Sequence, residues 1–372
     1  MTSGRLAKLR EDMEAAGEAV YLVGEAKNRR YLSGFTGSSG WLVVAPARAY
    51  LITDGRYWDQ VARQCPHIEL FRYLPAEHKT LVGAIEAVLQ SELSLSKGAR
   101  VAVEIDDMAV SGYRALSAML TERDYLPTDV EGRVKGYRTH KDESELGLMQ
   151  EAAALADAAL TAALRGFQPG RSEASLKAEI DYQVLRRGGE GAAFPTIVAS
   201  GINGSYPHAG ASDKLISEGE LITIDFGAIW RGYCSDMTRT IWYGELSEHD
   251  QNLVREVAAA QAKAVQAARP GLTTGDLDEV ARASLRAAGL AEYFVHSLGH
   301  GVGLDVHEGP TLRSGQTDTL SQGQVITIEP GVYLPGRTGC RIEDTLVLLP
   351  EGNRVLNQHP KQRLGETVPP LL

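Results

Sequence analysis

Two stretches of this 372-residue chain, "SEGELITIDFG" at 217–227 and "SQGQVITIEPG" at 321–331, align with each other without a gap. Six of the eleven positions are identical, and Asp225 stands where the second stretch has Glu329. Each stretch is preceded by a His-x-Gly and followed by a strand-like segment with another acid; these residues are His208 and Asp236, then His307 and Glu343. The repeat predicts two related halves, each with one histidine and a β-hairpin that carries two acids.

The acids of the repeat share one phase along their strands. Successive side chains of a strand point to opposite faces, so Thr223 and Asp225 lie on one face and apolar residues on the other. The same phase pairs Asp236 with Thr238, Thr327 with Glu329, and Glu343 with Thr345. The two acids of each hairpin lie almost symmetrically about its turn, which predicts cross-strand neighbours with Cβ atoms about 4.5–5.5 Å apart.

Four clustered carboxylates need compensation, because like charges and burial both raise the pKa of a carboxyl group. They must hold either protons or cations. Two divalent ions about 3.5–4 Å apart would balance four negative charges, and two-metal hydrolases use that separation. An isolated acid would be interpreted as a surface residue or a salt-bridge partner. Four acids at matching positions on the strands of two repeated segments instead favour a metal site.

Three of the nine histidines lie in "HSLGHGVGLDVH", residues 296–307. His296 and His300 have the spacing of a helical zinc pair, but three nearby glycines disfavour a helix. We therefore expect an extended or looped segment. One histidine is enough to complete an oxygen-rich site, which leaves the other two available for substrate.

The rest of the chain predicts two domains, residues 1–135 and 136–372, divided in the polar segment 126–143. The first alternates helices and strands, beginning with a helix that ends at Gly17, and is expected to be an α/β unit. The second has an α+β pattern. Four helices are expected in it. The first ends before residues 166–170, and the second begins at Ser172 as N-cap and ends at Gly188. The third begins at Ser247 as N-cap and ends before Pro270, and the fourth runs from Thr274 as N-cap to Gly289 as C-cap.

Composition excludes several classes of protein. The chain has 43% hydrophobic and 23% charged residues and a net charge of -10, which is typical of a soluble globular protein and disfavours nucleic-acid binding. It has no apolar run of about 20 residues and no secretion-signal pattern, so we expect no membrane span and a cytoplasmic location. Cys65, Cys234 and Cys340 lack CxxC spacing and are expected to be buried thiols.

The segments "DFG…SDMTRT", "HSLGHGVGLDVHE", "EPGVY" and "RIED" resemble the signature of the pita-bread metallopeptidases, in the proline-specific branch of aminopeptidase P and prolidase. "NRRYLSGFTGSSG" and "LITDGRYWDQ" are similar to the creatinase/prolidase amino-terminal domain. The resemblance implies an α+β pita-bread (creatinase/aminopeptidase) fold with a pseudo-twofold internal repeat, preceded by a smaller α/β domain.

The resemblance also implies five metal ligands: Asp225 for the first ion, Asp236 and Glu343 bridging both, and His300 and Glu329 for the second. Water or hydroxide between the ions would be the nucleophile, with Glu329 as proton acceptor. Manganese is the expected metal, and cobalt, zinc or iron also suits such a site.

Four further residues carry substrate roles by the same resemblance. His208 would stabilise the oxyanion together with a metal, and His307 would contact the carbonyl of the penultimate residue. His296 would line the substrate pocket, and Arg341 would anchor the peptide and hold the site. For Tyr333 a site role and core packing both stay open.

The resemblance implies an Xaa-Pro aminopeptidase, which releases the N-terminal residue from peptides with proline second. This activity is favoured over prolidase because the short amino-terminal domain with "FTGSSG" and "TDGRY" looks closer to small bacterial aminopeptidase P relatives. An X-Pro bond is a tertiary amide without an N–H, so it needs a dedicated enzyme. The alternatives are an Xaa-Pro dipeptidase (prolidase), a methionine aminopeptidase, and a metal-free binding module or creatine-type hydrolase. A homodimer is implied too, with the N-terminal domain covering the partner's site.

Overall fold

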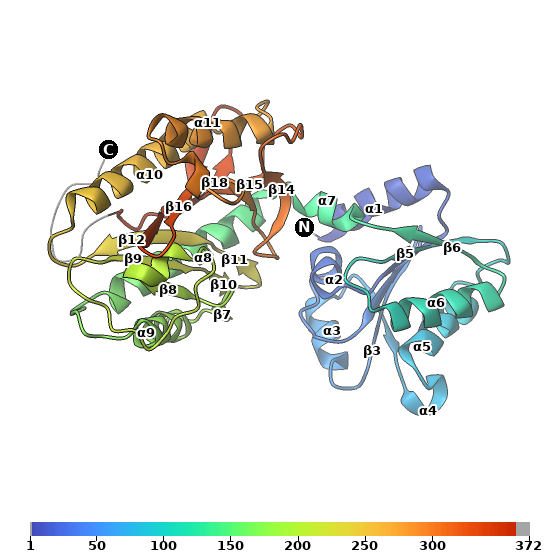
Figure 1. The fold of residues 1–372 in the computed structure, drawn as a ribbon. Helices are drawn as coiled ribbons and strands as arrows, with labels where there is room; N and C mark the ends of the chain where they lie inside the picture. Colours follow the sequence, from blue (N-terminus) through green and yellow to red (C-terminus); the bar gives the residue numbers. More distant parts are fainter. Residues whose placement is uncertain (1, 362–372) are drawn as a thin grey trace. The chain divides into compact units, whose positions relative to one another are not determined.

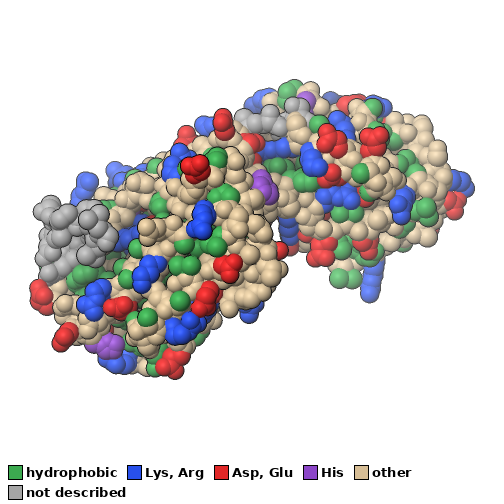
Figure 2. Space-filling model, turned by 90° about the horizontal axis from the view of Figure 1, so that it is seen from above, with side chains coloured by type: hydrophobic (Ala, Val, Ile, Leu, Met, Phe, Trp, Pro, Cys, Tyr) green, Lys and Arg blue, Asp and Glu red, His purple; other side chains and the backbone are tan. Residues whose placement is uncertain are grey.

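The computed structural model describes residues 2–361, and the chain divides between Tyr137 and Arg138 into two compact units. Within the described range, no helix is long and apolar enough to cross a membrane. On the face drawn in Figure 2, acidic and basic side chains are interspersed, without a large area of basic side chains alone. The three cysteines are buried free thiols, as predicted.

The first unit contains a six-stranded mixed sheet in the order β4-β3-β2-β1-β5-β6. Figure 1 labels β3, β5 and β6 of this sheet. Its core joins strand residues such as Leu22 and Val103 to Ile85 and Leu120 on the helices. The strands are β1 (Val20–Val23), β2 (Trp41–Val44), β3 (Ala49–Thr53), β4 (Glu69–Arg72), β5 (Arg100–Glu104) and β6 (Leu126–Val130). The helices are α1 (Thr2–Ala16), α2 (Ala26–Ser33), α3 (Trp58–Gln64), α4 (Pro75–His78), α5 (Leu81–Ala87) with its continuation η1 (Val88–Glu92), α6 (Val110–Glu122) and α7 (Arg133–Arg138).

The second unit has the two related halves that the repeat predicts. In the first half, β8 (Ile197–Ser200), β9 (Leu221–Phe226) and β12 (Met237–Trp242) form a sheet that packs on α8 (Glu143–Ala163) and α9 (Glu173–Arg186). In the second, β15 (Val325–Ile328) and β18 (Asp344–Leu348) lie in a sheet that packs on α10 (Glu248–Ala267) and α11 (Thr274–Ala287) (Figure 1). That sheet also contains β13 (Gly299–Gly301), β14 (Glu308–Leu312) and β19 (Asn353–Val355).

Each half interrupts its central strand pair with a short hairpin that belongs to another sheet. Between β9 and β12 this hairpin is β10 (Ala228–Trp230) and β11 (Tyr233–Cys234), which is joined by β7 (Gly191–Ala192). Between β15 and β18 it is β16 (Gly331–Leu334) and β17 (Thr338–Arg341). The short 3-10 helices η2 (Gly201–Ser205) and η3 (Ala291–Tyr293) complete the unit. The repeated sequence thus corresponds to a repeated strand–hairpin–strand arrangement.

The interrupting hairpins make the predicted pairing of acids across each hairpin wrong in the first half. Asp225 lies opposite Thr238, and Asp236 precedes the first pair of the ladder, Met237 with Phe226. The hairpin diverges into another sheet before Asp236, so the chain does not turn symmetrically between the two acids. In the second half, the ladder between β15 and β18 runs to Ile328 and Asp344, and Glu329 and Glu343 lie just outside it.

Side-chain caps fix the helix starts of the second unit. Ser172 and Ser247 cap α9 and α10 as predicted. The N-cap prediction for α11 was wrong by one residue, because the hydroxyl of Thr273, not that of Thr274, accepts the backbone N–H of Asp276. Its C-cap is Ala288, and Gly289 follows in the left-handed region at φ 71°.

Candidate metal centre

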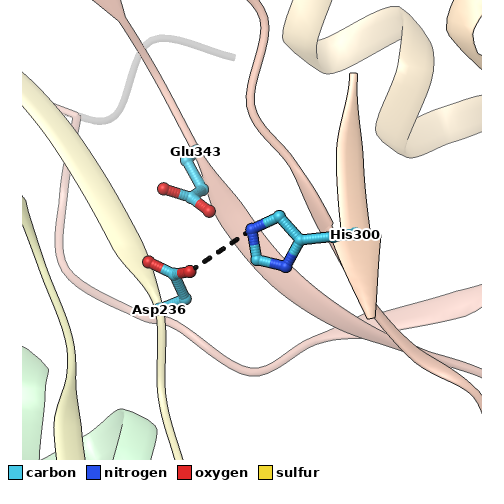
Figure 3. A group of neighbouring side chains, drawn as sticks. All are labelled: Asp236, His300 and Glu343. Carbon is cyan, nitrogen blue, oxygen red and sulfur yellow. Dashed lines mark ion pairs between the residues drawn. The ribbon is translucent and has the colours of Figure 1, made fainter. Parts of the chain in front are cut away.

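Side chains from both halves meet at the ends of the central strands. Figure 3 shows Asp236, just before β12, and Glu343, just before β18, pointing toward His300 on β13. One ligand atom from each of these three residues lies within 4.8 Å of the others. His300 Nε2 is 3.7 Å from Asp236 Oδ2 and 3.3 Å from Glu329 Oε1. The pseudo-repeat thus brings together acids that lie more than a hundred residues apart in the sequence.

The histidine segment is extended at His300, as expected, and its glycines explain why. A Cβ atom on Gly299 would lie 2.1 Å from the carbonyl oxygen of Thr327, and one on Gly301 would lie 2.0 Å from that of Gly309. The backbone N–H of His300 donates to Thr327 Oγ1 at 3.1 Å. Its Nδ1 lies 3.1 Å from the carbonyl of Gly301, which favours a proton on Nδ1 and leaves Nε2 free to bind a cation.

Burial and mutual repulsion oppose ionisation of three of the acids. Burial, followed by the charges of Glu343 and Asp225, raises the pKa of Asp236 well above its usual range. Burial and the neighbouring acids likewise raise the pKa of Glu343 strongly. Burial raises the pKa of Asp225 despite the opposing charge of Arg341. A cation would remove this penalty.

Glu329 differs from the other three acids. Burial opposes its ionisation, but the hydrogen bond and charge of His300, together with smaller contributions from His296 and Arg341, lower the pKa of Glu329. The hydroxyl of Thr327 also donates to Glu329 Oε1 at 3.2 Å. Glu329 is therefore the acid of the cluster that is most readily unprotonated at neutral pH.

The donor set fits a divalent cation. Asp225 Oδ1 and Glu343 Oε1 are buried and have no hydrogen-bond partner among the described residues. Their second oxygens are held in place, because Arg341 Nη2 donates to Asp225 Oδ2 at 2.6 Å and Thr238 Oγ1 donates to Glu343 Oε2 at 2.7 Å. Carboxylate oxygens with one imidazole suit manganese, cobalt, zinc or iron.

Arg341 lies buried beside the acids and links them to the pocket wall. Besides Asp225 it contacts the hydroxyls of Tyr333, at 2.5 Å, and Thr238, at 3.1 Å. The Tyr333 hydroxyl also lies 2.9 Å from His296 Nε2. Tyr333 thus joins Arg341 to His296, and the sequence could not separate this position from core packing.

One cavity of about 760 Å³ collects the site residues named from the sequence. His208 and His307 are exposed at its wall, and the His307 ring packs edge-on to His300 with centroids 4.3 Å apart. The cavity is lined by Asp225, Asp236, Glu329, Glu343, His208, His296, His300, His307 and Arg341.

Sequence reasoning missed one wall of the cavity. Phe194, Pro195, Thr196 and Ile197 line it from the start of β8, and Lys177 lines it from α9. An aromatic residue next to proline before a strand, in "AAFPTIVASG", was the available signal. It lies outside the repeated motif and carries no metal-ligand chemistry.

Comparison with known proteins identifies both units. Residues 147–350 match metallopeptidase family M24, and residues 5–140 match the creatinase/prolidase N-terminal domain. An uncharacterised peptidase of Bacillus subtilis is 36% identical over 96% of this chain and 99% of its own length. The structure of an Xaa-Pro dipeptidase from Bacillus anthracis has a TM-score of 0.91 at 35% identity, covering 98% of this chain and 99% of the other. That of an X-Pro aminopeptidase from Thermotoga maritima has a TM-score of 0.86 at 33% identity, covering 94% and 97%.

Proposed function

The chain belongs to metallopeptidase family M24, and from this premise we propose that it is an Xaa-Pro aminopeptidase. It would remove the N-terminal residue from peptides with proline second. The observation that supports a hydrolytic metal site most strongly is the convergence of four acids and His300 in one cavity, with two buried carboxylate oxygens lacking partners. Residues 136–372 would then be the catalytic domain, acting in a cytoplasmic homodimer.

We propose that the five residues predicted from the sequence hold two divalent ions, manganese in the cell. They are Asp225, Asp236, His300, Glu329 and Glu343. Such ions supply Lewis-acid polarisation of a peptide carbonyl and acidify water at neutral pH. The chain's part is to fix the ligands: Arg341 holds Asp225, and Thr238 holds Glu343.

Five residues would handle the proton and the substrate. Glu329 would accept a proton during attack on the scissile bond and pass it to the leaving nitrogen. His208 would donate a hydrogen bond to the developing oxyanion, and His307 would contact the carbonyl of the penultimate residue. His296, held by Tyr333, and Arg341 would shape the pocket around the peptide.

A dipeptidase is the second candidate, because solved relatives of similar identity include both an Xaa-Pro dipeptidase and an X-Pro aminopeptidase. The two activities differ in whether the pocket accepts chain beyond proline. A methionine aminopeptidase is disfavoured by the N-terminal domain, and metal-free modules or creatine-type hydrolases by the presence of all five ligand residues.

A peptide-length series tests the proposal. Protein reconstituted separately with manganese, cobalt or zinc is given Ala-Pro, Ala-Pro-Ala, a longer Ala-Pro peptide and the matched Ala-Ala-Ala. We expect hydrolysis only with proline second and faster turnover of the longer peptides. Equal or better turnover of Ala-Pro would establish the dipeptidase instead, and equal cleavage of Ala-Ala-Ala would contradict both.

A further inference from the structure

Glu308, the neighbour of His307, is a buried acid between two buried cations. Its side chain is 5% exposed, and it accepts hydrogen bonds from Arg138 Nη2 at 2.8 Å and from Lys141 Nζ at 2.6 Å. The side chains of Arg138 and Lys141 are 2% and 1% exposed. The cations belong to the segment that opens the second unit, far in sequence from the histidine loop.

The loop between His300 and Glu308 is folded tightly against this carboxylate. A Cβ atom on Gly303 would lie 2.4 Å from Glu308 Oε1. Arg138 also pairs with Asp305 at 2.5 Å, within the same loop. The strand pairing shifts between His300 and Gly301, so that Gly301 lies opposite Glu308. Backbone hydrogen bonds from Val302 to Val325 and from Cys234 to Gly303 hold the start of this loop, and the ion pairs of Asp305 and Glu308 hold its end.

His307 itself has little else to orient it. Its side chain is exposed at the cavity, and no hydrogen bond to its ring is found within residues 2–361. Its ring contact is with His300, edge-on at 4.3 Å between centroids. Besides this ring contact, the position of the imidazole depends on the backbone at residues 307 and 308.

We propose that Glu308, clamped by Arg138 and Lys141, is a positioning residue that sets the place of His307 in the substrate cavity. This inference rests on the proposed role of His307 as a substrate contact. Loss of the charge of Glu308 removes the carboxylate that pairs with buried Lys141 and leaves Arg138 paired with Asp305, so the loop is expected to shift to let water reach Lys141. A small displacement of a positioning group can reduce turnover by orders of magnitude.

The test variant is Glu308→Gln, which keeps the shape of the side chain and removes its charge. We expect unchanged metal content, faster amide hydrogen exchange in residues 301–310, and about a tenfold or greater fall in kcat/KM for Ala-Pro-Ala. In a His307→Ala background the same change should cost less than about twofold, since the contact that it positions is already gone. Glu279→Gln, which breaks the exposed pair with Arg286 at 2.8 Å, is the matched control and should change neither readout.

Several outcomes overturn the inference. The first is unchanged amide hydrogen exchange in residues 301–310 of Glu308→Gln, and the second is an unchanged kcat/KM in that variant. The third is an equal fall in kcat/KM whether Glu308→Gln is made in the wild type or in the His307→Ala background. If the wild-type protein cleaves no Xaa-Pro peptide, the proposed function fails, whereas hydrogen exchange still decides whether the clamp holds the loop. Should Glu308→Gln not fold, the double variant Lys141→Met/Glu308→Met removes both charges of that ion pair and leaves Arg138 paired with Asp305. Wild-type activity in this double variant would also refute the role of Glu308.

Discussion

Replacement of Thr238 by valine should weaken metal binding with little change in shape. Thr238 is fully buried, and its hydroxyl donates to Glu343 Oε2 at 2.7 Å and accepts from Arg341 Nε at 3.1 Å. A hydrogen bond to a charged group contributes about 1.5–3 kcal/mol, which corresponds to roughly a ten- to hundredfold change in an equilibrium constant. Loss of a partner that orients a ligand typically costs metal affinity by a similar factor. We therefore expect manganese to bind Thr238→Val about ten- to a hundredfold more weakly.

The assay is titration of metal-free protein with manganese against a chromogenic chelator. Thr223→Val is the matched control, since Thr223 is also buried in the β9–β12 pair but its hydroxyl lies 3.2 Å from that of Thr240 and contacts no acid. Thermal unfolding of both variants monitors the fold. Wild-type affinity in Thr238→Val, or equal weakening in the two variants, would refute the idea that Thr238 orients Glu343.

Three further predictions concern the ligand histidine, a buried acid of the first unit and a buried ion pair. His300→Ala should lose its metal, whereas His296→Ala and His307→Ala should keep it and turn over more slowly; metal retained by His300→Ala would remove it from the ligand set. Burial raises the pKa of Glu104 from 4.5 to about 8, so its neutral form stabilises the fold fully below about pH 4.5, and this contribution is lost as pH rises through about 8. Glu104→Gln still accepts the hydrogen bond from Asn28. The free energy of urea unfolding should therefore fall less steeply with pH in this variant than in the wild type, by up to about 1.4 kcal/mol per pH unit. Equal slopes in the two proteins would contradict the prediction. Asp344→Asn leaves Arg239 buried without its charge partner at 2.8 Å and should cost about 3–5 kcal/mol in urea unfolding, a loss that the exposed-pair variant Glu279→Gln should not share.

Most of the fold and site predictions came from the internal repeat. Identical spacing of hydroxyl residues and acids in the two copies requires a common structural cause, so duplicated halves followed from residues 217–227 and 321–331 alone. Comparison with solved relatives confirms the two-part fold, with a creatinase-type first domain and a pita-bread second domain. Local signals also fixed helix ends well, as at Gly17, Ser172 and Ser247.

Three tertiary features could not be predicted from the sequence: the separate hairpin of the first half, the pocket wall at Phe194 and the ion pairs of Glu308. Nothing in residues 227–236 indicates that the chain leaves the sheet as a separate hairpin, and this departure is why Asp225 faces Thr238 rather than Asp236. The pocket wall around Phe194 comes from a segment outside the repeat. The clamp on Glu308 depends on Arg138 and Lys141, more than 160 residues away, and no local pattern reports such a contact.

The most direct test of the account is to remove and restore the metal while measuring hydrolysis of Ala-Pro-Ala. The chelated protein should be inactive, and activity should return in proportion to manganese bound, reaching its maximum at two ions per chain. Purified protein without stoichiometric divalent metal, whose activity is unchanged by chelation, would contradict the proposal that the four acids and His300 form a catalytic metal centre.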